Sequence, residues 1–338
     1  MIKEKICIAR VDRMGDMLLT LPVIKTLKIQ RNNAEIHVIA SKTNSKVLKN
    51  INYIDKVIVV NSNIHSLFNE IIILRKNYYS SFFNFSPNLK SLLLCLLCKS
   101  KKKFSLIFLS RYKKNFSKIF FRFIAFVFFD KNHIIDRLQR LKSNLELHQT
   151  KMMFELINKS GFKPLNKKER IEIALPKNKI SFKAKKTILI HIPDKWINLF
   201  YSEEDLIQLI SNLVKKNYLV LLTTDYSTKN KFKKIFRLYK TILNNDLNKI
   251  SKIKEKVIIL DKFNYDSWLN AIYSSDIIIT PECGCSHISA ACGTLVNIIY
   301  DPNNFPEAII KEYAPWNSKY NKFLFNEENL NSKLIDAI

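Results

Sequence analysis

Short apolar runs alternate with amphipathic stretches over the amino-terminal part of the chain. The pattern predicts strands at 6–11, 35–40 and 56–60, with helices at 16–28 and 45–50. Apolar strands separated by helices are typical of βαβ units that build a parallel sheet. This part of the chain is therefore predicted to be a Rossmann-like domain.

A second alternating series begins near residue 187. The predicted strands are 188–192, 218–223, 256–260, 276–280 and 295–300, and the predicted helices are 203–216, 229–243, 265–273 and 286–292. The polar join between the two series lies at about 163–186. We therefore expect an α/β protein with two domains, 1–170 and 171–338.

The middle of the chain is less regular. Residues 61–180 give no clear alternation, except that 136–160 reads as one long amphipathic helix closed by Gly161. The stretch 305–316 is expected to cross back toward the first half of the chain.

Positive charge is the strongest compositional feature, with a formal net charge of +27. Residues 71–129 contain no Asp or Glu, and two apolar runs, 91–98 and 119–129, lie among their basic residues. Both runs are shorter than the ~20 residues of a membrane-spanning helix. Basic residues mixed with Phe and Leu favour a region, about 90–130, that lies on a membrane surface, although a core helix with a solvated lysine face is the alternative. The cations expected to contact an acceptor or the membrane are Lys101, Lys102, Lys103, Arg111, Lys113 and Lys114.

The start of the chain and its cysteines indicate a cytoplasmic protein. No long apolar segment follows Met1, so no secretory signal is expected. The six cysteines are then expected to be reduced thiols. Cys95 and Cys98 have metal-like spacing but no second pair of ligands, and no metal site is predicted.

Glycine is rare, with four residues in the chain, and this gives each glycine weight. Gly15 and Gly284 each lie where an apolar strand passes into a helix, and they are expected to have a positive φ or to let a ligand approach the backbone. Gly293 is expected to end the second of these helices, and Gly161 to stop the helix before it.

Two groups of residues at these turns could carry chemistry. Asp16, beside Gly15, is either an ordinary helix-capping carboxylate or a general base for a hydroxyl substrate. Glu282, Ser286 and His287 surround Gly284 at a helix start, where backbone N–H groups favour a diphosphate. A structural histidine is the alternative there. Both turns are expected to open into a cleft between the two domains.

Two sequence motifs resemble those of a known family. RMGDMLLTLP at 13–22 resembles the amino-terminal signature of the heptosyltransferases, glycosyltransferase family 9. DIIITPECGCSHISAACGT at 276–294 resembles the DTGxxHxxAA pattern of the same family. The resemblance implies the GT-B fold, with two Rossmann-like domains facing each other across a cleft. It also implies metal-independent, inverting transfer of a sugar, typically heptose from an ADP-linked donor, onto a lipopolysaccharide-core or related acceptor.

The resemblance also implies roles for individual residues. Asp16 matches the catalytic base, Gly284 and His287 match donor-contacting positions with Ser286 beside them, and Glu282 stands in place of the family's donor-contacting Asp. Glu keeps the charge of Asp but lengthens the side chain.

Two further donor contacts rest on weaker matches. Lys195 is the counterpart of a lysine that approaches the donor phosphate, although the family's Lys-x-Trp-Pro spacing is not reproduced. Asp225, in a turn where the family has Gly-Gly, is the candidate for contacting the ribose.

The sequence features also bear on three functions other than glycosyl transfer. A nucleic-acid-binding protein would explain the charge, but no helix-turn-helix, zinc-finger or RNP-type signature occurs. A nicotinamide-dependent oxidoreductase is disfavoured because the chain has no GxGxxG. A degenerate family member acting as a scaffold stays open. The expected protein is a monomer without cofactor, peripheral on the cytoplasmic face of the inner membrane, with a nucleotide-sugar donor and an anionic glycolipid as partners.

Overall fold

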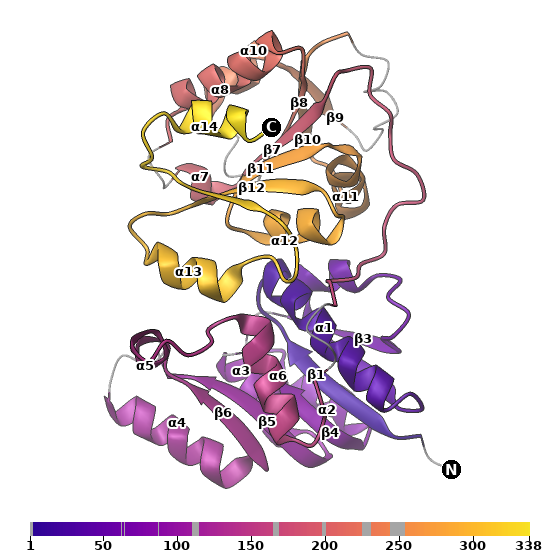
Figure 1. Cartoon of the computed structure of the whole chain (residues 1–338). Coiled ribbons are helices and arrows are strands. Elements are labelled where there is room, and N and C mark those ends of the chain that lie inside the picture. The colour runs from indigo at the N-terminus through magenta and orange to yellow at the C-terminus, as the bar shows by residue number, and fades with distance from the viewer. Residues whose placement is uncertain are drawn as a thin grey trace. The chain divides into compact units, whose positions relative to one another are not determined.

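The chain forms two α/β units (Figure 1). The computed structural model describes residues 3–61, 63, 65–86, 88–109, 115–164, 169–197, 201–224, 231–243 and 254–338. One unit contains Met1–Ala174 and Lys311–Asn317, and the other contains Leu175–Ile310 and Ser318–Ile338. All but the last residue of Lys311–Asn317 lies within 305–316, the stretch expected to cross back.

The first unit is built on a parallel six-stranded sheet in the order β3-β2-β1-β4-β5-β6. Its strands are β1 (Lys5–Arg10), β2 (Glu35–Ser41), β3 (Lys56–Val60), β4 (Tyr79–Asn84), β5 (Ser100–Phe108) and β6 (Lys131–Ile135). Its helices are α1 (Met14–Gln30), the short 3-10 helix η1 (Asn44–Leu48), α2 (Leu67–Arg75), α3 (Leu89–Leu97), α4 (Asn115–Phe128), α5 (Arg137–Lys142) and α6 (Gln149–Lys159).

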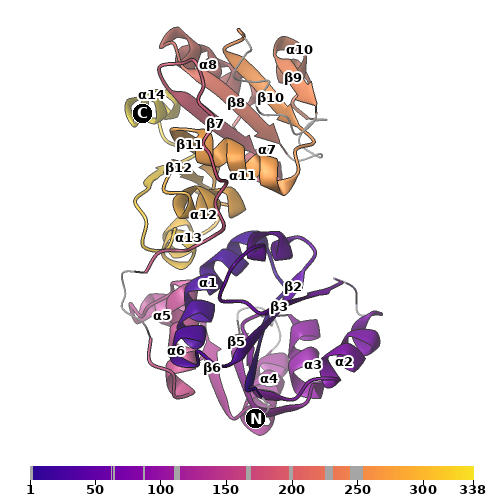
Figure 2. The same cartoon turned by 90° about the vertical axis from the view of Figure 1, so that its right-hand side faces the viewer.

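Two layers of helices cover this sheet. Helices α2, α3 and α4 lie on one face, and α1 and α6 pack together on the other (Figure 2). Strand β1 is fully buried from Ile6 to Ala9, because a central parallel strand is covered on both faces. The strand order reverses between β1 and β4, which makes their carboxyl ends the topological switch point of the unit.

The second unit is built on a parallel seven-stranded sheet in the order β13-β12-β11-β7-β8-β10-β9. Its strands are β7 (Thr187–Ile192), β8 (Leu219–Thr224), β9 (Lys240–Leu243), β10 (Val257–Asp261), β11 (Ile277–Pro281), β12 (Leu295–Tyr300) and β13 (Asn321–Leu324). Its helices are α7 (Asp194–Ile197), α8 (Glu203–Lys215), α10 (Lys233–Leu238), α11 (Tyr265–Ser274), α12 (Gly284–Ala291), α13 (Pro306–Tyr313), whose last turn groups with the first unit, and α14 (Leu330–Asp336).

The core of the second unit explains which helices form. Apolar side chains of α8 and α14 pack on one face of the sheet, where Leu206, Leu209 and Leu334 are fully buried. Ser202 caps α8 by accepting a hydrogen bond from the backbone N–H of Asp205 at 3.0 Å, as the sequence predicts. The strand order reverses between β7 and β11, so this sheet also has a central switch point.

Two predicted helices are wrong. Residues 136–160 form two helices, α5 and α6, because Asn144 between them has a left-handed φ of 51° and His148 caps α6. Residues 229–243 contain the short helix α10, after which Lys240–Leu243 turns into strand β9 and pairs with β10.

Two of the four glycines have a positive φ. Gly161 and Gly293 have positive φ values of 91° and 72° and follow helices, as predicted. Gly15 and Gly284 have no positive φ, because each lies in the first turn of its helix. For these two glycines the approach of a ligand to the backbone stays a prediction.

The two apolar runs of the region 90–130 differ in their burial. The apolar run 91–98 falls in α3 and its end, where Leu92, Leu94, Cys95 and Cys98 are at most 4% exposed. Most of this run is therefore core, although Leu97 is 46% exposed. No helix in the described parts of the chain is both long enough and apolar enough to span a bilayer.

Candidate active site

The turn after β1 holds the proposed base. Arg10 ends the strand, and Asp16 is the third residue of α1. The Arg10 guanidinium lies 2.8 Å from Asp16 Oδ1, and its Nε lies 3.5 Å from a carboxylate oxygen of Asp12. Arg10 also donates a hydrogen bond to the carbonyl oxygen of Phe85, just beyond β4. The ion pairs therefore sit at the β1–β4 switch point.

Burial makes this guanidinium depend on its partners. The Arg10 side chain is 2% exposed. Burial by itself would lower the pKa of Arg10, but the carboxylates of Asp16 and Asp12 outweigh it and raise the pKa from its ordinary value. Arg10 is therefore a fixed cation that holds the Asp16 carboxylate in place.

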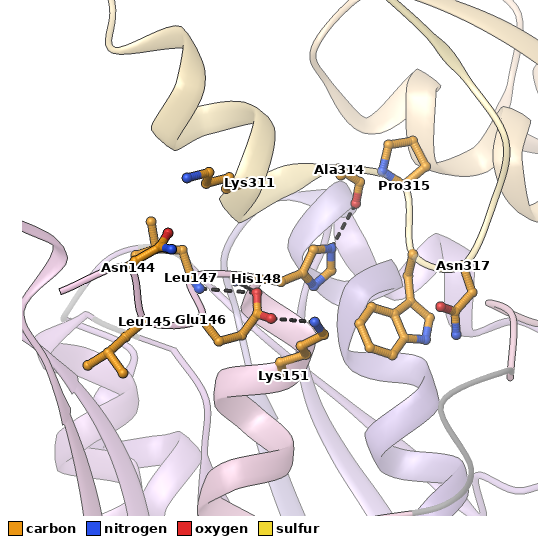
Figure 3. Close-up of a pocket in the computed structure, with 11 residues that line it drawn as sticks. Asn144, Leu145, Glu146, Leu147, His148, Lys151, Lys311, Ala314, Pro315 and Asn317 are labelled. Carbon is orange, nitrogen blue, oxygen red and sulfur yellow. Dashed lines mark hydrogen bonds and ion pairs between the residues drawn. The ribbon is translucent and has the colours of Figure 1, made fainter. Parts of the chain in front are cut away.

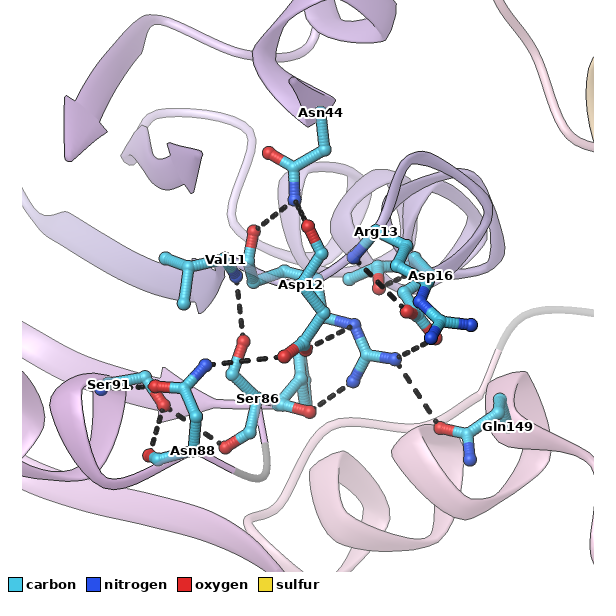
Figure 4. A network of polar contacts seen from close by, with 12 residues as sticks. Val11, Asp12, Arg13, Asp16, Asn44, Ser86, Asn88, Ser91 and Gln149 are labelled. Carbon is cyan, nitrogen blue, oxygen red and sulfur yellow. Dashed lines mark hydrogen bonds and ion pairs between the residues drawn. The ribbon is translucent and has the colours of Figure 1, made fainter. Parts of the chain in front are cut away.

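The loop between β1 and α1 is held by side chains from two other segments (Figure 4). Asn44 donates to the carbonyl oxygens of Arg10 and Asp12 at 2.9 and 3.1 Å. Ser86 accepts from the backbone N–H of Val11 at 2.7 Å. These bonds fix the direction in which the loop presents Asp16.

Asp16 also performs the structural role considered for it. Its Oδ2 accepts a hydrogen bond from the backbone N–H of Arg13 at 3.3 Å, which satisfies one donor at the start of α1. Each carboxylate oxygen has a second lone pair, and the side chain remains 15% exposed. Capping and proton acceptance are therefore compatible in this geometry.

The network extends into the segment that crosses back. Gln149, the first residue of α6, accepts from Arg10 at 3.5 Å and donates to Glu312 at 2.7 Å. Glu312 is 2% exposed and forms an ion pair with Arg137 at 2.7 Å. Arg10, Gln149, Arg137 and Glu312 escaped the sequence analysis. The one available signal was Arg10, a lone charge at the end of an apolar strand.

A pocket of about 460 Å³ lies beside this network, within the first unit (Figure 3). Among the residues that line it are Lys151, Lys311 and Trp316. The pocket is lined by residues of two segments, 144–151 and 311–317. His148 connects these segments, because its Nε2 lies 3.0 Å from the carbonyl oxygen of Ala314. Lys151 forms an ion pair with Glu146, which also lines the pocket, so Lys311 is the cation that lies beside the indole without a carboxylate in this lining. No sequence pattern predicted this pocket.

The second candidate turn lies at the other switch point, between β7 and β11. Lys195 follows β7 and Glu282 follows β11. The Lys195 ammonium forms an ion pair with the Glu282 carboxylate and donates to the Glu282 carbonyl oxygen at 2.7 Å. The structure thus joins two residues that were predicted separately as donor contacts.

A pocket of about 220 Å³ opens at this ion pair. Beyond Lys195 and Glu282, its lining includes Tyr300, the last residue of β12, and Asp301 and Asn304, which follow that strand. The Lys195 side chain is 41% exposed, so its ammonium remains available to a ligand. The sequence analysis missed the residues after β12, although they lie at the carboxyl end of a predicted strand.

The start of α12 contains the remaining predicted donor residues. Gly284 is its first residue, and Ser286 donates to the carbonyl oxygen of Cys283 at 2.7 Å. Ser286 and His287 are 0% and 1% exposed. The side chains of both residues therefore lie within the protein, and what the turn offers a ligand is the backbone at its first residues.

His191 lies near the end of β7 and contacts Thr223 of β8 and Trp268 of α11. Its Nδ1 lies 2.9 Å from the Thr223 hydroxyl. Burial lowers the pKa of His191 to about 4, and its hydrogen bond with Thr223 offsets part of that effect. The imidazole is therefore neutral at physiological pH.

The predicted basic contacts divide into described and undescribed residues. Lys101, Lys102 and Lys103 lie at the amino end of β5, while Asp16 follows the carboxyl end of the parallel strand β1. Lys103 donates through Nζ to the carbonyl oxygen of Leu96 at 2.5 Å. These lysines therefore do not reach the Asp16 turn. Arg111, Lys113, Lys114 and Asp225 lie outside the described residues.

Metal ligation was also considered. Within the described ranges, no group of three or more His, Cys, Asp or Glu side chains is placed to hold a metal ion.

The fold is that of the GT-B glycosyltransferases. The chain is similar to a family 9 glycosyltransferase from Veillonella parvula, with 16% identity, a TM-score of 0.70, and 99% of this chain and 88% of that chain covered. It is similar to the E. coli heptosyltransferase WaaC with ADP, with 15% identity, a TM-score of 0.71 and 98% of both chains covered.

A third similar structure is the E. coli ADP-heptose lipopolysaccharide heptosyltransferase II, with 13% identity, a TM-score of 0.72, and 98% of this chain and 96% of that chain covered. No protein-family model and no curated protein sequence matches the chain. At these identities the similarity establishes the fold, and the activity has to be argued from the residues.

Proposed function

We propose that the protein is a glycosyltransferase of the family 9 type that transfers a sugar from a nucleotide donor with inversion. One observation carries the proposal. Both family-like motifs fall at the topological switch points of their sheets, one presenting Asp16 and the other the Lys195–Glu282 pair. Switch points are where open α/β sheets bind ligands.

In the proposed reaction, Asp16 accepts the proton of an acceptor hydroxyl. The hydroxyl oxygen forms a bond to the anomeric carbon as the bond from that carbon to the donor phosphate breaks on the opposite face. The nucleoside diphosphate leaves with the bonding electron pair. Lys195 and the first backbone N–H groups of α12 stabilise its growing negative charge.

The donor is proposed to be ADP-linked, and heptose is the favoured sugar. Support comes from the similar E. coli structures, one described with ADP and the other as an ADP-heptose enzyme. The diphosphate competes with Glu282 for the Lys195 ammonium, so donor binding loosens an ion pair already formed in the free protein. The reaction is proposed to need no metal or cofactor.

The acceptor is proposed to be an anionic glycolipid of the lipopolysaccharide-core type. The pocket lined by Lys311 and by the Lys151–Glu146 ion pair lies beside the Arg10–Asp16 network, and Lys311 supplies a cation there for an acidic acceptor. The protein is proposed to work as a monomer, peripheral on the cytoplasmic face of the inner membrane.

A panel of nucleotide sugars tests the donor. Thermal unfolding would be followed with ADP-heptose, ADP-glucose, UDP-glucose and the free nucleotides, because a ligand of the folded state raises the midpoint. Protection by the ADP-linked sugars alone supports the proposal. The protecting donor is then incubated with a truncated lipopolysaccharide acceptor in EDTA, and the anomeric configuration of the product is read by NMR.

Three outcomes would contradict it. Protection by no nucleotide supports the scaffold alternative. Transfer that stops in EDTA contradicts metal independence, and a product with retained configuration contradicts direct displacement.

A further inference from the structure

Helix α4 exposes a continuous apolar stripe. Its members recur at helical spacing along one side of the helix and are 48–84% exposed: Phe116, Ile119, Phe120, Phe123, Phe126 and Val127. Single exposed apolar residues are ordinary, but a contiguous apolar patch on a soluble protein marks a contact surface. We call these six residues the α4 stripe.

The opposite side of α4 is already packed. Ala125 is fully buried and belongs to the core cluster over the sheet, and Phe121 and Ile124 pack against that cluster. The helix is therefore apolar on both sides, and its inner side accounts for its place in the fold. Packing within the unit leaves the α4 stripe without a partner among the described residues.

The neighbouring helices of the same layer extend this surface. Phe68 of α2 is 73% exposed, and Leu97 of α3 is 46% exposed. The charges exposed on this layer are cationic, and among them are Arg75, Lys76 and Arg122.

Helices α2, α3 and α4 carry no exposed carboxylate among the described residues. The sequence has no Asp or Glu between 71 and 129, and the one acid of α2, Glu70, is 7% exposed and lies 2.6 Å from the Lys90 ammonium. The first exposed acid beyond α4 is Asp130, which accepts a hydrogen bond from the backbone N–H of Lys103. The outer surface of α2–α4 therefore combines apolar side chains with uncompensated positive charge.

We propose that α4 is an in-plane membrane-docking helix whose stripe inserts at the headgroup boundary of an anionic bilayer. An interfacial helix of this kind buries its apolar face about 5–10 Å into the boundary, with cations beside it at the lipid phosphates. The inference rests on the peripheral membrane location proposed above and names the helix that provides it, but it does not depend on the transfer chemistry, because its residues lie on α4 and not in the Asp16 or Glu282 turns.

The charge and the pattern favour a bilayer over other occupants. Two copies of this chain meeting through the stripe would bring two cationic layers together, which opposes dimerisation. Single-stranded nucleic acid binds where cations alternate with stacking rings along a groove. Here six apolar side chains follow one another on a single side of a helix without a polar interruption.

Vesicle flotation tests the proposal. The full chain is mixed with vesicles of phosphatidylcholine and phosphatidylglycerol, or with phosphatidylcholine alone. Wild-type protein is expected to float with the anionic vesicles. The double variant Phe123→Asp with Phe126→Asp is expected to lose about tenfold or more of this partitioning, because two rings no longer leave water. Arg122→Glu is expected to lose at least about fivefold, on anionic vesicles only.

The matched control is Leu238→Asp. Leu238 is 55% exposed on α10 of the other unit, so its replacement adds one negative charge, half of the charge that the double variant adds, outside the stripe and should not change partitioning. Because the altered side chains are exposed, thermal unfolding should match wild type in all variants. Phe126→Trp adds a depth probe: its fluorescence, above the wild-type background, should be quenched by brominated lipid.

Four results overturn the proposal. In flotation, the double variant could partition like wild type, or the Leu238 control could lose as much as the double variant. The wild-type protein could bind random single-stranded RNA and no vesicles. It could also form a dimer in light scattering that the double variant abolishes, and bind no vesicles. Donor protection against unfolding is measured in parallel. A double variant with normal protection and lost flotation separates this inference from the transfer reaction.

Discussion

The turns after β1 and β11 have the same architecture but hold their charges differently. Each follows a central parallel strand, opens a helix with an early glycine and lies at a switch point of its sheet. In the first turn, the cation Arg10 is 2% exposed and is held by several partners. In the second, the cation Lys195 is 41% exposed.

Because of this difference, the charges of the first turn stay paired, whereas the cation of the second can change its partner. A buried guanidinium with two carboxylate neighbours cannot be released without leaving uncompensated charges, so Asp16 stays where the fold puts it. A half-exposed ammonium beside one carboxylate is worth little as an ion pair and can turn to an incoming phosphate. The first turn is therefore suited to proton transfer and the second to binding and releasing a nucleotide.

Replacing the carboxylate of Asp16 should have the largest effect. Asp16→Asn keeps the shape and leaves an oxygen for the Arg13 N–H, but it removes the proton acceptor. Turnover with the donor found in the panel is expected to fall by about 10²–10⁴-fold, the range of a general base. Initial rates at saturating substrates measure it.

The control for Asp16 is Asp55→Asn. Asp55 is also paired, with Lys28 at 2.9 Å, but it lies near the amino end of β2. Its replacement should leave turnover within a factor of about two, since it touches neither turn. Equal losses in both variants would mean that Asp16 acts through stability alone.

Removing the buried cation should destabilise the first unit. Arg10→Met leaves Asp12 and Asp16 facing each other without a counter-charge, at a cost of about 3–5 kcal/mol in the free energy of unfolding. Amide hydrogen exchange in β1 and α1 measures the loss. Lys25→Met, which breaks exposed pairs with Glu169 and Glu172, should cost under about 1 kcal/mol. Similar losses in the free energy of unfolding of the two variants would show that the buried ion pairs of Arg10 are no more important than exposed ones.

The second unit should lose stability in mild acid through His191. The pKa of His191 is about 4 in the folded protein, against its ordinary value of 6.5. Its contribution is complete above about pH 6.5 and is lost as the pH falls toward 4, because only the unfolded chain binds the proton in that window. The full loss is about 3 kcal/mol.

Urea unfolding of the second unit between pH 4 and 7 measures this window. His191→Gln should unfold with a shallower dependence on pH than wild type, and the exposed His65→Gln should not differ from wild type. A steep wild-type slope that persists in His191→Gln would assign the acid sensitivity to other groups.

Lys195→Ala should weaken donor binding by about tenfold to a hundredfold, the value of a charge-assisted hydrogen bond to phosphate. Calorimetric titration with the nucleotide measures it. Lys234→Ala removes a comparably exposed lysine paired with Glu204 and should bind normally. Unchanged affinity in Lys195→Ala would remove this lysine from the donor site.

Local periodicity predicted the regular parts of the fold. Strands such as 56–60 and 295–300 match the observed β3 and β12 because short apolar runs between turns have few other structures open to them. The elements in the middle of the chain were not predicted. Strand β4, for example, carries Ser81 and Asn84 although it is buried, and these polar side chains interrupt the apolar run.

The two apolar runs of the basic region show a second limit. The runs in α3 and α4 look alike in sequence, yet α3 is mostly buried and α4 exposes a stripe. The difference depends on how much of each helix the neighbouring elements cover, which is a tertiary property. Periodicity alone cannot supply it.

The sequence predicted the two turns of the candidate site but not the partners of their residues, because those partnerships also depend on tertiary structure. The turns could be found because glycine and a charged residue follow apolar runs. The partners of Asp16 could not, because the network joins Gln149 and Glu312 across 163 positions of the chain. The pairing of Lys195 with Glu282 likewise depends on the crossover that makes β7 and β11 neighbours.

The central claim is the division of labour between the two turns, and donor affinity in Asp16→Asn tests it most directly. Calorimetric titration of the nucleotide into this variant should give a dissociation constant within about twofold of wild type, in the same preparation whose turnover is lost. Weakened nucleotide binding with turnover preserved would contradict the account, because Asp16 would then belong to donor binding and the base would have to be another residue.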